Sequence, residues 1–217
     1  MGLLDIFRWS RKTTTILPTD IVVFIVGPSG SGKSWLLSIL LKMANTHVPV
    51  NRGQKPCTTK VHAERCHFEG MQGDIILVDT PSFYTYIRPD GEKTVKKWID
   101  SNYIQPKGAG ILYMHNIASN PLDPNLEVSR HFSAFRRTCP QGHAPSVARV
   151  VPTVALGSTL SAEKINTSMT RLRYQADSIG ASILGMPFDG KPGTAWDVVQ
   201  ELLNEIMRYG GDNQRGE

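Results

Sequence analysis

The stretch Ile21-Val-Val-Phe-Ile-Val-Gly27-Pro-Ser-Gly-Ser-Gly-Lys33-Ser-Trp-Leu-Leu37 decides the fold of this chain. Its first part, residues 21–26, is a continuous run of β-branched and aromatic residues, which is typical of a strand buried on both faces of a parallel sheet. Leucines recur at helical spacing in residues 33–43, so a helix is expected there. Between strand and helix, residues 27–34 match G-x-x-x-x-G-K-[ST] at every fixed position.

This segment predicts a phosphate-binding loop. Successive backbone N–H groups of such a loop form a nest for anionic oxygens, and the helix that follows adds partial positive charge. Glycines supply the positive φ angles that the loop needs. The lysine is expected to reach the β- and γ-phosphates, and the last serine hydroxyl to ligate Mg²⁺. The predicted nucleotide-binding residues of the loop are Gly27, Pro28, Ser29, Gly30, Ser31, Gly32, Lys33 and Ser34.

Three further positions complete the predicted site. Asp79 ends an apolar strand, where a carboxylate beside a phosphate loop is expected to hold Mg²⁺. Upstream, a hydroxyl from Thr58 or Thr59 could bind the same ion and an amide could touch the γ-phosphate. Ser82 follows Asp79-Thr-Pro and would offer its amide to the γ-phosphate.

The remaining sequence alternates strands and helices, which predicts a three-layer α/β fold with a mostly parallel sheet. Segments 60–68 and 74–78 flank a turn-rich connection and should form a hairpin with one antiparallel strand. We expect a nucleotide-binding domain over residues 20–209, an N-terminal extension over 1–19 and a disordered tail over 210–217. Further strands are expected at 110–115, 148–156 and 181–188, and helices at 95–104 and after Asp123, Ser161 and Thr194.

The composition limits the function classes. The chain has 217 residues, 40% of them hydrophobic and 20% charged, with a net charge of +5 that is scattered, so no nucleic-acid-binding face is expected. Three cysteines predict a reducing, cytoplasmic location. No apolar run approaches the ~18 residues of a membrane span. Residues 1–12 mix apolar and basic side chains, which leaves three interpretations: a membrane-surface helix, a helix packed on the domain, or a frayed end.

With phosphate loop, threonine, hairpin and Asp79-Thr-Pro in this order, the chain resembles the translation-factor-like GTPases, whose element order is that of a Ras-like G domain. The Thr-Lys and Asp-Thr-Pro-x-Phe patterns resemble the AIG-type (immune-associated nucleotide-binding) and septin branch. The chain also resembles single-domain fungal G-domain proteins, in which a strand like residues 110–115 and a late segment like Pro187-Phe-Asp with Trp196 recur. The resemblance implies GTP/GDP and Mg²⁺ as ligands, Thr59 as the metal-binding threonine, since it precedes a lysine, and dimerisation across the nucleotide face.

Three departures from the family pattern limit what the resemblance implies. Ser82 stands where a switch glycine is usual, and Phe83 replaces the glutamine that orients the attacking water, so intrinsic hydrolysis should be slow. Residues 153–158 contain neither the lysine nor the aspartate of the Asn/Thr-Lys-x-Asp motif that reads guanine. Guanine preference is therefore implied by the resemblance alone, and adenine is not excluded.

Three functions remain open from the sequence. The first is a GTP–Mg²⁺ switch with slow hydrolysis, and the second is a nucleotide-binding interaction or assembly module without turnover. The third is an ATP-dependent kinase-like protein, although Asp79-Thr-Pro does not suit it. A zinc site of Cys57, His62, Cys66 and His67 is disfavoured because the spacing fits no common pattern and a strand turns neighbouring side chains to opposite faces. His115 is interpreted as a structural residue.

Overall fold

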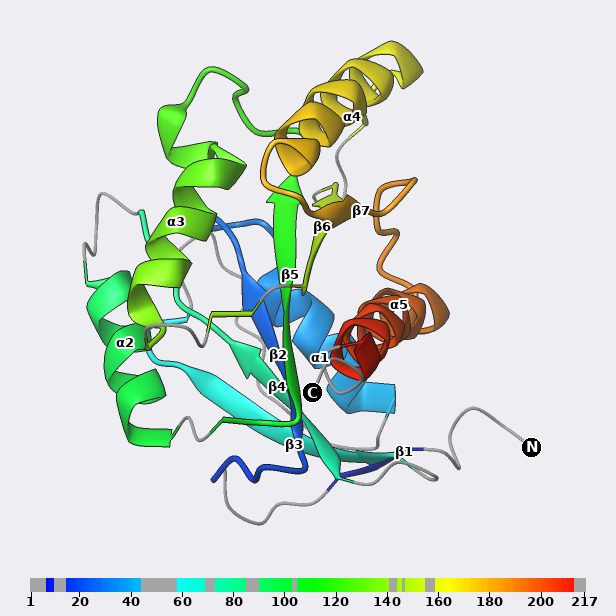
Figure 1. The fold of residues 1–217 in the computed structure, drawn as a ribbon. Coiled ribbons are helices and arrows are strands. Elements are labelled where there is room, and N and C mark those ends of the chain that lie inside the picture. Colours follow the sequence, from blue (N-terminus) through cyan, green and yellow to red (C-terminus); the bar gives the residue numbers. More distant parts are fainter. Residues whose placement is uncertain are drawn as a thin grey trace.

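The computed structural model describes residues 7–9, 15–43, 58–68, 73–84, 90–102, 105–140, 144–145, 147–154 and 159–212. Strands and helices alternate along most of the chain (Figure 1). The strands are β1 (Phe7–Trp9), β2 (Ile21–Val26), β3 (His62–Phe68), β4 (Asp74–Asp79), β5 (Gly108–Asn116), β6 (Val147–Thr153) and β7 (Ser182–Ile183). The helices are α1 (Lys33–Met43), α2 (Gly91–Asn102), α3 (Val128–Thr138), α4 (Ala162–Asp177) and α5 (Pro192–Asp212), with a 3₁₀ turn at Pro124–Leu126.

The strands form one seven-stranded sheet in the order β1-β3-β4-β2-β5-β6-β7. Strand β2 pairs in parallel with both β4 and β5, and β3 pairs antiparallel with both β1 and β4. Strand β3 therefore runs against all the others, which confirms the predicted hairpin and the single antiparallel strand. This is the sheet of a Ras-like G domain with one extra edge strand.

That edge strand, β1, differs from the interpretations of residues 1–12 at three positions, and the other residues of that segment lie outside the described part of the chain. Neither a helix nor a frayed end was found at Phe7–Trp9, because these residues pair with Cys66–Phe68 of β3. A lone segment of three residues carries no readable strand period, and its conformation is decided by the open edge of β3.

Helices cover both faces of the sheet (Figure 1). One core lies between the sheet and α1 and α5, where Leu36, Leu40 and Leu202 are fully buried. The second lies under α2, α3 and α4, where Phe24 contacts Phe135 edge-on, with ring centroids 4.9 Å apart. Every residue of β2 is buried, as the continuous apolar run predicts for a central parallel strand. The phosphate loop therefore begins on the most buried strand of the sheet.

Several element boundaries differ from the sequence expectation; α2, for example, begins at Gly91 rather than at residue 95. Asp123 caps a 3₁₀ turn rather than α3 itself, since Glu127 is extended and separates the two. Strand β7 ends at Ile183, and only Phe188 bridges again to Thr153, because Gly185 and Pro187 intervene. Helix α5 begins at Pro192 and continues to Asp212, which places its end inside the segment expected to be a tail.

A buried charge network fastens the hairpin to the sheet at the end opposite the phosphate loop. The Arg65 guanidinium donates to both carboxylate oxygens of Asp20, at 2.9 and 2.8 Å, and to Asp74 Oδ2 at 2.7 Å. The side chains of Arg65 and Asp20 are only 8% and 1% exposed. Asp20 Oδ2 also accepts from the Leu17 N–H. The network thus joins the start of β2 to both strands of the hairpin.

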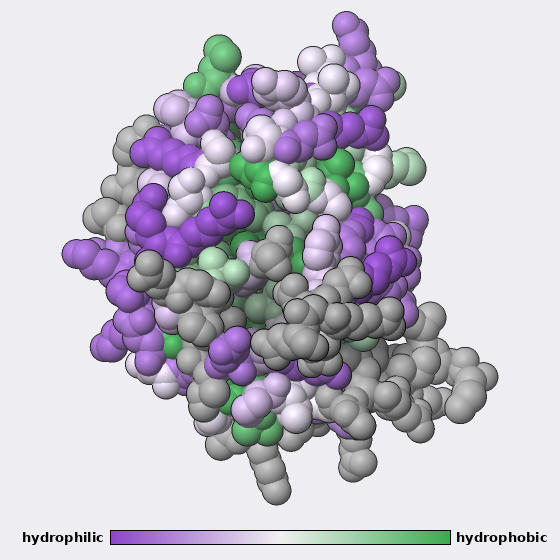
Figure 2. Space-filling model, viewed as in Figure 1, coloured by the Kyte–Doolittle hydropathy of each residue, from purple (hydrophilic) through white to green (hydrophobic). Residues whose placement is uncertain are grey.

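The surface seen from the side of Figure 1 is mostly hydrophilic, with a few apolar side chains near its centre (Figure 2). Among the described residues, exposed large apolar side chains include Leu122, Tyr174 and Met186. No helix of this part of the chain combines the length and the apolar character needed to cross a bilayer.

Candidate nucleotide-binding site

The loop between β2 and α1 has the backbone that the glycine pattern predicts. Gly27, Gly30 and Gly32 have φ angles of 148°, 74° and 93°. A Cβ at Gly27 would lie 2.2 Å from the carbonyl oxygen of Met114 on the neighbouring strand β5, so only glycine fits there. The Leu36 N–H donates to the Gly32 oxygen at 2.9 Å, which starts α1 at the end of the loop. The helix N-terminus therefore points into the loop, as an anion site requires.

Lys33 lies folded back across this loop. Its ammonium donates to the carbonyl oxygens of Gly27 and Pro28, at 2.9 and 2.8 Å, and to the Ser82 hydroxyl at 3.1 Å. Burial lowers the pKa of Lys33 to about 8, an effect that the negative charge of Asp79 partly offsets. The amine is therefore mainly protonated at neutral pH, and its charge lies between the loop and the segment after β4.

Three oxygen-bearing side chains meet beside the ammonium. Ser34 Oγ donates to Asp79 Oδ2 at 2.7 Å and lies 2.7 Å from Thr58 Oγ1, which itself lies 3.3 Å from Asp79 Oδ2. Thr58 and not Thr59 makes these contacts, and Thr59 is exposed. The threonine that the structure brings to Ser34 and Asp79 is therefore Thr58, whereas the sequence favoured Thr59.

This oxygen cluster fits a magnesium ion. Asp79 Oδ1 is buried and has no hydrogen-bond partner in the described part of the protein, and burial raises the pKa of this carboxyl group. A divalent cation would supply the missing partner and the positive charge. Hydroxyl and carboxylate oxygens suit Mg²⁺, which binds to one or two carboxylates together with substrate phosphates.

The segment after Asp79 is anchored to α3. Phe83 is only 3% exposed, and its ring centroid lies 6.3 Å from those of both His131 and Phe135. The next residue, Tyr84, lies under the guanidinium of Arg130, which is 4.2 Å from the ring centroid. Phe83 therefore fills the second core, where it has no group that could orient a water molecule.

On the other side of the loop lies an aromatic group that the sequence analysis did not single out. Trp35, which directly follows Ser34, is half-buried and packs against Phe188 with ring centroids 5.3 Å apart. A Cβ at Gly190 would lie 2.1 Å from the indole, so a glycine is required beside this ring. The only sequence signal was its position, immediately after the phosphate-loop serine.

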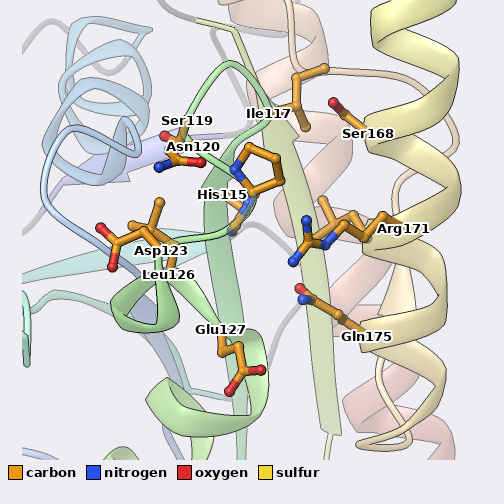
Figure 3. A pocket seen from close by; sticks show the side chains of 12 residues that line it. His115, Ile117, Ser119, Asn120, Asp123, Leu126, Glu127, Ser168, Arg171 and Gln175 are labelled. Atoms are coloured by element: carbon orange, nitrogen blue, oxygen red, sulfur yellow. The ribbon is translucent and has the colours of Figure 1, made fainter.

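A separate pocket opens between the end of β5, the loop that precedes α3, and α4. Figure 3 shows His115 and Arg171 facing one another across it. Its volume of about 40 Å³ suits a few water molecules but not a nucleotide. Burial, with a smaller contribution from Arg171, lowers the pKa of His115 to about 4, so this histidine is neutral at pH 7. The pocket does not belong to the phosphate site.

The two hairpin histidines contact carboxylates, and Cys66 lies on the other face of the strand from His67. Cys66 is buried while the adjacent His67 is exposed and contacts Asp74, and His62 contacts Glu64 at 2.7 Å. Cys57 lies outside the described residues. Within the described ranges, no group of three or more His, Cys, Asp or Glu residues is arranged to hold a metal ion.

The fold and the loop together define a P-loop nucleotide-binding protein with a Ras-like G domain. The family model described as "50S ribosome-binding GTPase" matches residues 22–137, more than half of the chain. The protein belongs to this GTPase family. Membership of the family implies that it binds a guanine nucleotide. No curated protein sequence matches the chain significantly.

Solved structures agree on the fold. The chain is similar to Toc33 from Arabidopsis thaliana, with a TM-score of 0.52 and 15% identity over 76% of this chain and 70% of that one. It is also similar to the bacterial selenocysteine-specific elongation factor EF-Sec, with a TM-score of 0.57 and 12% identity over 86% of this chain and 29% of that one. At these identities the similarity extends to the fold alone.

Proposed function

We propose that this protein is a Mg²⁺-dependent GTP-binding switch whose intrinsic GTP hydrolysis is slow. The observation that carries the proposal is the convergence of Lys33 with the oxygens of Ser34, Thr58 and Asp79 at the mouth of the phosphate loop. The loop amides and the ammonium would bind the β- and γ-phosphates. Of the remaining loop residues predicted for the site, Ser29, Gly30 and Ser31 would contribute backbone N–H groups, and Pro28, which has no N–H, contributes the carbonyl that accepts from Lys33.

The proposal assigns the metal to Ser34, Thr58 and Asp79, with Thr58 in place of Thr59. Bound Mg²⁺ would neutralise charge on the phosphate oxygens. Ser82 contacts Lys33 through its hydroxyl, so it is well located for its amide to contact a γ-phosphate. A triphosphate would then order the segments that carry Thr58 and Ser82, as in other nucleotide switches.

Slow hydrolysis is proposed because of Phe83. In a G domain this position normally orients the attacking water, and a buried phenyl ring offers neither donor nor acceptor. The same observation favours a second candidate, a nucleotide-binding assembly module without turnover, because Phe83 and Tyr84 hold the segment on α3.

Titration of the purified protein with GTP and ATP, each with Mg²⁺ or EDTA, followed by phosphate release, tests these functions. The switch predicts Mg²⁺-dependent GTP binding and release on the order of 10⁻⁴ s⁻¹ or slower. Tight binding without release would support the assembly module instead. ATP turnover that needs an added acceptor would favour a kinase-like protein. Absence of binding at millimolar nucleotide would contradict all three.

Replacing Thr58 with alanine is expected to weaken GTP binding roughly fivefold to tenfold in Mg²⁺, since one hydroxyl next to the metal position is lost. In EDTA the variant and the native protein should bind with equal affinity. Thr59→Ala is the matched control, because Thr59 is exposed, and it should leave both affinities unchanged. Isothermal titration calorimetry measures both, and a larger effect for Thr59→Ala would restore the original assignment.

Dimerisation across the nucleotide face belongs to the same proposal, as does membership of the AIG-type and septin branch. The support is the resemblance of the motifs, together with the similar fold of Toc33, which was crystallised as a dimerization-deficient mutant. Sedimentation of the protein with GDP and with a slowly hydrolysed GTP analogue tests it. A mass that stays monomeric with both nucleotides would contradict it.

A further inference from the structure

The contacts of the phosphate loop differ between the two sides of strand β2. Lys33 reaches Ser82 on the side of β4, where Asp79 also lies. On the opposite side of β2, the Ser31 carbonyl accepts from the Thr153 hydroxyl, at the end of β6, at 2.9 Å. In the sheet order, β4 lies on one side of β2, and β5, β6 and β7 lie on the other. If the γ-phosphate and Mg²⁺ lie near β4, the nucleoside of the same molecule extends toward β6 and β7.

Trp35 lies on this nucleoside side. Its ring packs on Phe188, whose backbone bridges to Thr153. A Cβ at Gly32 would lie 3.6 Å from the indole and 3.7 Å from the Thr153 methyl group, so the phosphate loop, the end of β6 and Trp35 are neighbours. Gly190, with a φ of 77°, brings the backbone against the other part of the ring. An aromatic side chain is thus held next to the path of the nucleoside.

We propose that the base of the bound nucleotide stacks on the indole of Trp35. This inference rests on the proposed function and deepens it. Residues 153–158, where a base-reading aspartate is expected, contain no acidic side chain. Every base has a π face, so stacking on an aromatic ring provides affinity that depends little on the hydrogen-bonding edge. Trp35 supplies binding energy for the nucleoside that the missing aspartate does not provide.

Competition of GTP and of inorganic tripolyphosphate against a fluorescent GTP analogue separates stacking from phosphate binding. Trp35→Ala is expected to weaken GTP roughly tenfold, the loss of one stacked base, and to change tripolyphosphate less than about twofold. Trp35→Phe should retain most of the GTP affinity, because a phenyl ring still stacks. Trp98→Ala is the matched control, since Trp98 packs edge-on against Phe24 under the opposite face of the sheet, and it should bind GTP as the native protein does.

A second readout does not depend on the alanine variant. Stacking of guanine on an indole quenches the indole fluorescence. GTP should therefore lower the tryptophan fluorescence of the native protein, and tripolyphosphate should not. The quenching should disappear in Trp35→Phe although that variant still binds GTP.

Two outcomes overturn the inference while the proposed function stands. One is an equal loss of GTP and tripolyphosphate affinity in Trp35→Ala, which would make Trp35 a support of the loop. The other is unchanged GTP affinity in that variant together with unchanged quenching in Trp35→Phe. If the native protein binds neither GTP nor tripolyphosphate, the proposed function itself fails, and the stacking inference fails with it.

Discussion

Replacing Lys33 with alanine should weaken GTP binding by about tenfold or more, because a charge-assisted contact to phosphate is worth roughly 1.5–3 kcal/mol. The ammonium is the cation that the structure places between the loop and Ser82, and its three hydrogen bonds already hold it at the loop mouth. Tripolyphosphate affinity should fall by the same factor, since the lost contact is to phosphate and not to the base. Calorimetric titration of both ligands measures this.

Lys42→Ala is the matched control, because Lys42 lies on the same helix and is exposed. It should bind GTP as the native protein does. In Lys33→Ala the carbonyl oxygens of Gly27 and Pro28 lose their hydrogen-bond donor. Thermal unfolding of both variants without nucleotide reports whether this loss destabilises the fold. Affinity that is unchanged in a folded Lys33→Ala protein would refute the role given to this lysine.

Replacing Asp20 with alanine should lower the free energy of unfolding by about 3 kcal/mol, the low end of the range for breaking a buried ion pair, because Arg65 keeps one carboxylate partner. Asp20 accepts two of the hydrogen bonds of Arg65 and receives the Leu17 N–H as well. Its loss leaves Asp74 as the remaining carboxylate partner of Arg65. A lower urea midpoint, with the slope of the transition unchanged, would measure the effect.

Asp100→Ala tests the same change at an exposed pair. Asp100 contacts Lys96 at 3.1 Å, and both side chains are about half exposed. The free energy of unfolding should then change by less than about 0.5 kcal/mol. An equal shift in the two variants would mean that the burial of the Arg65 network adds no stability.

Most of the fold could be predicted from local patterns. The continuous apolar run of β2 and the helical spacing of the leucines in α1 can each be recognised within the segment itself. Helix α1 begins and ends where expected. Ser161 was identified as the cap of α4, and its hydroxyl accepts from the Lys164 N–H at 3.2 Å. Predictions of this kind succeed because capping and periodicity depend on residues within a few positions of one another.

Two predictions failed where a residue or segment interacts with a partner outside the expected element. Thr194 was predicted to cap α5, but its hydroxyl donates to Asp189 within the first turn of a helix that starts at Pro192. Residues 181–188 read as one strand, yet Leu184 and Phe188 reach β6 through separate hydrogen bonds to Val150 and Pro152. In both places a neighbouring segment supplied the competing interaction.

By itself, the sequence determined that the chain carries a phosphate-binding loop between a buried strand and a helix. The loop motif is local, because its glycine φ angles and its amides come from consecutive residues. Only the tertiary structure decided that Thr58 rather than Thr59 meets Ser34, that Phe83 is buried against α3, and that Trp35 packs against Phe188. Each of these contacts joins residues from separate elements, so its geometry is set by how the layers pack and not by spacing along the chain.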